Sequence, residues 1–280
     1  MQEKLNFSRY RDRLRQIRLV PISGRVTETV GLLVKAQGLK LPVGEACLIQ
    51  NKRGQVPAEV IGFQSDQQAM LMVLGEMEGL SPGDEVLATG RVPSMPVGQG
   101  LLGRVVDSMG RPIDNKGPVS YQDEYPLYQS PPSPLERESI TDTVSTGVRA
   151  IDALLTLGKG QRIGIFGGSG VGKTILMGMI ARNTTADVNV IALIGERGRE
   201  VQYFTNQVLG EEGLKQTVVI AATSDQPALM RIRGAFAAVA TAEYFRDQGK
   251  DVLFIMDSVT RLAMAQREVG MTVGEPPTTR

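Results

Sequence analysis

The chain has 280 residues, of which 41% are hydrophobic and 22% charged, so it is long enough for one large or two modest domains with a sizeable core. Its formal net charge of +1 gives no global field favouring nucleic acid or an anionic membrane, and no long apolar run predicts a membrane span or secretory signal. The single cysteine, Cys47, excludes a disulfide framework and is expected to be buried, and the lack of histidine excludes His-based zinc sites and His general bases.

Residues 1–20 are predicted to form a basic amphipathic helix. Lysine and arginine outnumber acidic residues there, and Leu5, Tyr10, Leu14 and Ile17 recur at three- and four-residue spacing. Such a helix binds a partner protein or lies on an acidic membrane surface. The alternative is a frayed, solvated terminus.

Residues 21–92 are predicted to form a small β-barrel. Short runs rich in valine, leucine and isoleucine, such as 46–49, 56–61 and 69–74, alternate with turn signals such as Ser81-Pro82-Gly83-Asp84. Many short strands at this spacing indicate a closed or nearly closed barrel. We expect its role to be structural, because closing a barrel leaves no strand edge open to unwanted pairing.

Residues 93–280 are predicted to form a second domain that begins with a connector. Within the connector, residues 103–114 are predicted to be a strand and a turn, and the proline-rich stretch 130–134 an extended segment. Apolar runs at 161–166, 188–194, 217–222 and 252–256 then alternate with helix-length stretches, the clearest helix lying at 227–248. This alternation predicts an α/β fold, with a parallel sheet covered by helices on both faces.

A phosphate-binding loop is the strongest motif of the chain. Residues 167–174 read Gly-Gly-Ser-Gly-Val-Gly-Lys-Thr, between a predicted buried strand at 161–166 and a predicted helix at 175–182. This setting disfavours the alternative, a glycine-rich turn with a surface lysine. Lys173 is expected to reach the β- and γ-phosphates, and the Thr174 hydroxyl to bind Mg²⁺. The residues expected to bind nucleotide are Gly168, Ser169, Gly170, Val171, Gly172, Lys173 and Thr174.

Two further apolar strands are followed by carboxylates. Asp257 ends the run 252–257 and is predicted to be a Walker-B-type ligand of Mg²⁺, the alternative being a helix cap. Glu196 follows the run 188–194, at the edge where ligands of open α/β sheets bind, and is predicted to orient the attacking water. Arg197 would offset charge on the phosphate, and Glu200 would bind the metal through water. The alternative for this charged run is a solvated helix face.

These segments together resemble the RecA-like superfamily of rotary and export ATPases. The segments 167–174, 195–200 and 257–261 occur in the same order and spacing, and 147–152 and 265–279 match as well. The sequences of residues 194–201 and 256–261 look like those of type III secretion ATPases, and the sequence of residues 262–268 is most similar to that of the flagellum-specific ATPase. The resemblance covers effectively the whole chain. A virulence type III secretion ATPase, an F-type ATP synthase β-like subunit and a non-catalytic nucleotide-binding ring subunit remain alternatives.

The resemblance implies a RecA-like P-loop ATPase that uses ATP and Mg²⁺ and assembles as a homohexamer. It implies that hydrolysis is coupled to delivery and unfolding of flagellar export substrates, in the cytoplasm at the inner face of the cell membrane. The implied partners are a regulatory or stator protein on the amino-terminal helix, the export gate, flagellar substrates and chaperones, and no nucleic acid.

Members of this superfamily continue past the position of Arg280, through the rest of the sheet and a carboxy-terminal helical domain. The resemblance places an arginine finger and an adenine-stacking aromatic in that part. We therefore expect a truncated chain that binds nucleotide but hydrolyses it slowly, since loss of an arginine finger costs roughly 10³–10⁵ in rate.

Overall fold

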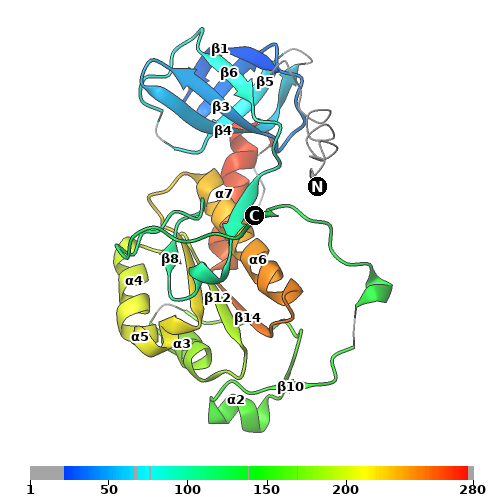
Figure 1. Cartoon of the computed structure of the whole chain (residues 1–280), viewed down its shortest axis with the longest axis vertical. Coiled ribbons are helices and arrows are strands. Elements are labelled where there is room, and N and C mark those ends of the chain that lie inside the picture. The colour runs from blue at the N-terminus through cyan, green and yellow to red at the C-terminus, as the bar shows by residue number, and fades with distance from the viewer. Residues whose placement is uncertain (1–21, 66–67, 76, 138, 169, 277–280) are drawn as a thin grey trace, which may run out of the picture. The chain divides into compact units, whose positions relative to one another are not determined.

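The computed structural model describes residues 22–65, 68–75, 77–137, 139–168 and 170–276 (Figure 1). The chain divides into two compact units, residues 1–91 and 92–280. The helix predicted at 1–20 lies outside the described residues.

The first unit is a closed antiparallel barrel whose strands follow the order β1-β2-β5-β4-β3-β6. The strands are β1 (Ser23–Val30), β2 (Leu33–Gln37), β3 (Ala46–Asn51), β4 (Gly54–Ser65), β5 (Gln68–Val73) and β6 (Glu85–Ala88). Alternate side chains point into the barrel, among them Val34 and Ala36 on β2 and Cys47 and Ile49 on β3. Cys47 is buried, as predicted, and the predicted barrel is confirmed.

A four-stranded parallel sheet forms the centre of the second unit, in the order β14-β12-β13-β8. The strands are β8 (Val105–Val106), β12 (Val188–Ile194), β13 (Thr217–Ala222) and β14 (Val252–Asp257), so the predicted strands at 188–194, 217–222 and 252–256 are confirmed. Leu193 pairs with Asp257 and Ile194 with Ala222. The carboxyl ends of three strands therefore meet at one edge of the sheet.

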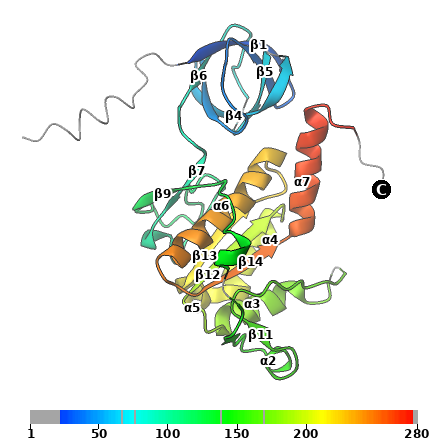
Figure 2. The ribbon, with the colours of Figure 1, turned by 90° about the vertical axis from the view of Figure 1, so that its right-hand side faces the viewer.

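Helices cover both faces of this sheet, as predicted (Figure 2). Val190 and Ala192 of β12 belong to a core with helix α6, whereas Ile191 and Leu193 belong to a core with α3 and η3. This alternation follows from the two-residue period of a strand. The helices are α2 (Arg149–Leu154), α3 (Lys173–Asn183), α4 (Gly198–Tyr203), the π-helix η3 (Phe204–Leu209), α5 (Gly210–Lys215), α6 (Ala228–Asp247) and α7 (Val259–Thr272).

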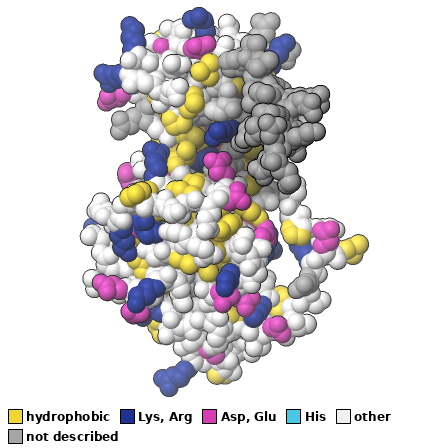
Figure 3. All heavy atoms as spheres, viewed as in Figure 1, with side chains coloured by type: hydrophobic (Ala, Val, Ile, Leu, Met, Phe, Trp, Pro, Cys, Tyr) yellow, Lys and Arg dark blue, Asp and Glu magenta, His cyan; other side chains and the backbone are white. Residues whose placement is uncertain are grey.

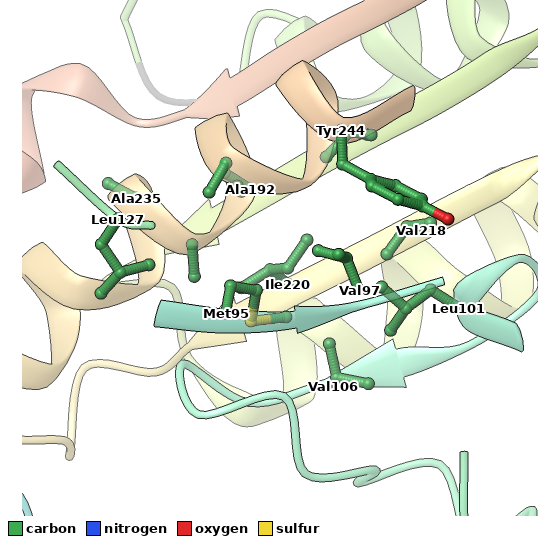
Figure 4. Close-up of a cluster of buried hydrophobic side chains, with 14 of the residues drawn as sticks. Met95, Val97, Leu101, Val106, Leu127, Ala192, Val218, Ile220, Ala235 and Tyr244 are labelled. Carbon is green, nitrogen blue, oxygen red and sulfur yellow. The ribbon is translucent and has the colours of Figure 1, made fainter. Parts of the chain in front are cut away.

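The connector contributes side chains to the core beneath α6 (Figure 4). Met95 and Val97 from β7, Leu101 and Leu127 pack with Ala235 and other residues of that core. Its elements are β7 (Ser94–Val97), paired with β9 (Asp123–Pro126), the 3-10 helices η1 (Gln99–Leu101) and η2 (Pro134–Glu136), and β10 (Thr143–Val144), paired with β11 (Leu157–Gly158). The strand and turn predicted at 103–114 are confirmed by β8 and the turn after it. Residues 130–133 are exposed and without regular structure, but Pro134 begins η2.

The buried strand predicted at 161–166 is wrong. These residues form no strand and are exposed, with 95% of Phe166 and 50% of Ile163 accessible to solvent. A strand forms only where its backbone N–H and C=O groups find a neighbouring strand. Among the described residues, β14 is the edge of the sheet, and no strand pairs with 161–166. The apolar composition of this segment was therefore insufficient to predict its structure.

Candidate functional site

The glycine loop leads directly into helix α3, which begins at Lys173. Gly170 and Gly172 have φ angles of 79° and 97°, a left-handed conformation that glycine adopts without steric cost. A Cβ atom added at Gly168, Gly170 or Gly172 would meet nothing within 4 Å, so the loop is open to a ligand. No side chain of the described residues caps α3, which leaves the N–H groups of its first turn available to an anion. Ser169 lies outside the described residues.

Lys173 holds its ammonium group over this loop. Nζ donates to the carbonyl oxygen of Gly167 at 2.7 Å and also to that of Gly168. Burial raises the pKa of the Asp257 carboxyl above its usual value, and the positive charges of Lys173 and Arg261 oppose this rise. The lysine of the loop and the carboxylate at the end of β14 are therefore near enough to interact electrostatically.

Glu196 follows β12 after a turn at Gly195, whose N–H donates to the carbonyl oxygen of Ala222 at 2.6 Å. Its side chain is 16% exposed, and its Oε1 lies 3.0 Å from Nε of Arg261. Burial raises the pKa of Glu196 to about 7, helped by a hydrogen bond to Glu200 and opposed by the charge of Arg261. The same hydrogen bond lowers the pKa of Glu200. As pH falls, Glu196 therefore takes up a proton before Glu200 does, and Glu200 stays charged.

The side chain of Arg197, predicted to act on the phosphate, is exposed and lies beside Glu200. Its side chain is 64% exposed, and Nη1 lies 3.8 Å from Oε1 of Glu200. The backbone N–H of Arg197 also donates to Oε2 of Glu200, at 3.3 Å. Both contacts belong to the first turn of α4, as the alternative of a solvated helix face would predict.

Arg261 is a residue of this cluster to which the sequence analysis gave no role. It lies in the first turn of α7, where its N–H donates to Oγ of the capping residue Ser258 at 3.4 Å. A Cβ atom added at Gly195 would lie 2.7 Å from Cδ of Arg261, so a glycine at this position makes room for the arginine. A basic residue four positions after the strand-ending Asp257 was the available signal.

The two units and their order match one family of known proteins. Residues 26–90 match the model of the ATP synthase alpha/beta family, beta-barrel domain, and residues 147–280 match that of the same family's nucleotide-binding domain. The chain belongs to the ATP synthase alpha/beta family. The nucleotide-binding match contains the glycine loop, Glu196, Asp257 and Arg261.

Two curated relatives are identical to the chain at about half of the aligned residues. The flagellum-specific ATP synthase of Bacillus subtilis is 53% identical over 92% of this chain and 59% of its own length. The type 3 secretion system ATPase of Xanthomonas euvesicatoria is 48% identical over 92% and 58%. The chain therefore spans about three fifths of the length of these relatives.

A solved structure is similar to the chain in fold. It is the assembled ATPase EscN in complex with its central stalk EscO, from the type III secretion system of enteropathogenic E. coli. EscN is 44% identical in sequence and superimposes with a TM-score of 0.84, over 92% of this chain and 63% of EscN.

A nucleotide-binding domain of this family implies a nucleotide as ligand, and the donor set fits one that carries Mg²⁺. Among the described residues, no group of three or more acidic or cysteine side chains could hold a metal ion without help. Mg²⁺ is commonly held by one or two carboxylates, waters and the phosphates of a substrate. Asp257 and the half-buried Thr174, with Glu200 through water, would supply such a partial set if they lie around one ion, and a nucleotide phosphate would complete it.

Proposed function

We propose that the chain is the nucleotide-binding part of an ATP-hydrolysing subunit of the flagellar type III protein export apparatus. The observation that carries the proposal is the convergence at one edge of the sheet. Arg261 forms an ion pair with Glu196, which follows β12. Arg261 and Lys173 of the loop both interact electrostatically with Asp257 at the end of β14. The names of the flagellum-specific relatives support the choice of apparatus.

Each side chain has a distinct task in the proposed reaction. The loop and the N-terminus of α3 bind phosphate oxygens through backbone N–H groups, and Lys173 exchanges its carbonyl partners for the β- and γ-phosphates. Thr174 and Asp257 hold Mg²⁺, with Glu200 acting through water. The ion, when bound, neutralises charge on the phosphates.

Glu196 orients the attacking water and accepts its proton. A pKa near 7 suits this task, because a general base works best when its pKa lies close to the operating pH. Arg197, which is exposed in the structure, would have to turn from Glu200 towards the phosphate to offset its charge.

A virulence type III secretion ATPase is the second candidate. The similarity to EscN and to the Xanthomonas euvesicatoria relative favours it. Co-purification distinguishes the candidates: flagellar export proteins support the first, injectisome proteins the second. A rotor stalk with a membrane proton channel would support an ATP synthase β-like subunit instead.

We further propose a homohexameric ring on the cytoplasmic face of the cell membrane, with a stator or regulatory protein on the amino-terminal helix. EscN is described as an assembled ATPase with a central stalk, which supports an oligomer and a partner of this kind. Its other partners would be the export gate, substrates and chaperones. No helix among the described residues is long and apolar enough to cross a membrane. Charges of both signs intermingle on the face of each unit in Figure 3.

Replacing Glu196 with Gln tests the proposed reaction. The amide has nearly the shape of the carboxyl group but cannot accept the proton, so steady-state hydrolysis should fall by roughly 10²–10⁴. The affinity for ATP should change little, because Glu196 is assigned no role in binding. The measurements are ATPase rate and nucleotide affinity of the complete protein, including whatever residues flank these 280. Hydrolysis within a few-fold of the unmodified protein would refute the role of Glu196.

A further inference from the structure

We propose that Arg261 is a positioning residue that holds the Glu196 carboxylate in the orientation needed to activate water, an inference that rests on the proposed function. Arg261 stands on α7, directly after the strand that carries Asp257. Through its contact with Glu196, it connects the proposed base, two residues after β12, to the proposed metal ligand at the end of β14. It thus fixes the relative positions of two groups that come from different strands.

The contact is made by the inner nitrogen of the guanidinium group. Nε of Arg261 lies 3.0 Å from Oε1 of Glu196, and the two side chains are 43% and 16% exposed. Cδ of the arginine passes so close to Gly195 that any side chain there would collide with it. The cap at Ser258 fixes the backbone of Arg261 at the start of α7. The helix cap therefore fixes the backbone of Arg261, and the close approach to Gly195 restricts the path of its side chain to Glu196.

The charges around Glu196 give this contact its importance. Glu200 and Asp257 both place negative charge near the Glu196 carboxylate. The other cations of the cluster have different partners: Lys173 donates to Gly167 and Gly168, and Arg197 lies beside Glu200. Among the described residues, Arg261 alone forms an ion pair with Glu196. Without it, repulsion would favour other orientations of the Glu196 side chain.

The test compares Arg261→Gln, Arg261→Lys, Glu196→Gln and the double variant Arg261→Gln/Glu196→Gln in the complete protein. Arg261→Gln should lower kcat roughly 100-fold, the cost of a small misplacement of a catalytic group, and leave the affinity for ATP within about two-fold. Arg261→Lys should recover part of the lost rate, because it keeps the charge. In the Glu196→Gln background, Arg261→Gln should cause no further loss, because the group that it positions is already inactive.

The control is Arg267→Gln, an exposed arginine of the same helix, which should leave the rate and the affinity unchanged. Additive losses of kcat in the double variant would overturn the proposal. A loss of ATP affinity large enough to account for the lower rate would also overturn it, because Arg261 would then be a phosphate ligand. If Arg261→Gln does not fold, the comparison of Arg261→Lys in the two backgrounds decides in the same way. Normal hydrolysis by Glu196→Gln alone would instead contradict the proposed function itself.

Discussion

Glu196 and Glu200 are two carboxyl groups of one cluster whose surroundings shift their pKa values in opposite directions. Burial, the hydrogen bond to Glu200 and the nearby negative charges raise the pKa of Glu196 to about 7. Glu200 accepts that hydrogen bond, which lowers its pKa. Such a divided pair is frequent in active sites, where one group has to exchange protons near neutral pH and its neighbour has to stay charged.

The raised pKa predicts how Glu196 affects stability. Because the folded chain binds this proton more tightly than the unfolded chain, the free energy of unfolding should decrease as pH rises from about 4.5 to about 7. Glu196→Gln cannot titrate, so its stability relative to the unmodified chain should improve between pH 5 and pH 8. Thermal unfolding without nucleotide or metal ion measures this. If the difference in stability between Glu196→Gln and the unmodified chain stays constant from pH 5 to pH 8, the raised pKa of Glu196 is contradicted.

At the scale of elements, the π-helix η3 and helix α5 pack tightly against α3, the helix that follows the glycine loop. A Cβ atom added at Gly178 of α3 would lie 2.0 Å from Cγ1 of Val208 in η3, and one added at Gly213 of α5 would lie 2.7 Å from Cγ of Arg182. Two glycines therefore allow these helices to approach closely. The π-turn of η3 lies at the first of these contacts, and such turns are frequent at functional sites.

Gly178→Ala should destabilise the chain by about 1–3 kcal/mol, because the added methyl group overlaps Val208. Adding Val208→Ala should restore part of this loss by making room. The control is Gly198→Ala, since a Cβ atom at Gly198 meets nothing within 4 Å. Denaturant unfolding of the four proteins measures the effects. Equal stability of Gly178→Ala and Gly198→Ala would show that the helices move apart at no cost.

A buried ion pair fixes the turn after β8. Asp114 accepts hydrogen bonds from Nε of Arg104 at 2.7 Å and from Nη2 at 2.9 Å, and the side chains are 11% (Arg104) and 6% (Asp114) exposed. Burial alone would raise the pKa of Asp114, but hydrogen bonds from Arg104 and the N–H groups of Val105 and Lys116 hold it below its usual value.

Asp114→Asn should cost about 3 kcal/mol, because it leaves the Arg104 guanidinium buried without its counter-charge. The contribution of the Asp114 carboxylate to the unmodified chain should be complete above about pH 4 and be lost as pH falls below it. Urea unfolding at pH 7 and at pH 3 measures both effects. A destabilisation by Asn that is as large at low pH as at pH 7 would contradict this assignment.

At the scale of the whole molecule, each unit has its own core, so each could be predicted from its own stretch of sequence. The barrel followed from regularly spaced strands and turns, and β12, β13 and β14 from short apolar runs. Residues 161–166 also contain a short apolar run, but whether a run becomes a strand depends on a pairing partner elsewhere. The burial of Met95 and Val97 beneath α6 depends likewise on contacts distant in sequence.

The candidate site shows the same division between local and long-range information. The motifs predicted that Glu196 and Asp257 lie near each other, because the ends of parallel strands share one side of a sheet, and the pairing of β12 with β14 agrees with this. The proximity of Lys173 to Asp257 does not follow from strand pairing, because residues 161–166 form no strand. The motifs could not show that Arg197 turns to its own helix, or that Arg261 reaches Glu196 from α7. These directions are set by the packing of side chains from separate elements.

The most direct test is an experimental structure of the complete protein with Mg²⁺ and a non-hydrolysable ATP analogue. We predict that Lys173 leaves the carbonyl oxygens of Gly167 and Gly168 for the β- and γ-phosphates, and that Asp257 lies beside the metal ion. The Glu196 carboxylate should be one water molecule away from the γ-phosphorus. A structure with nucleotide bound, but with Glu196 far from that phosphorus and Lys173 still on the loop carbonyls, would contradict the account.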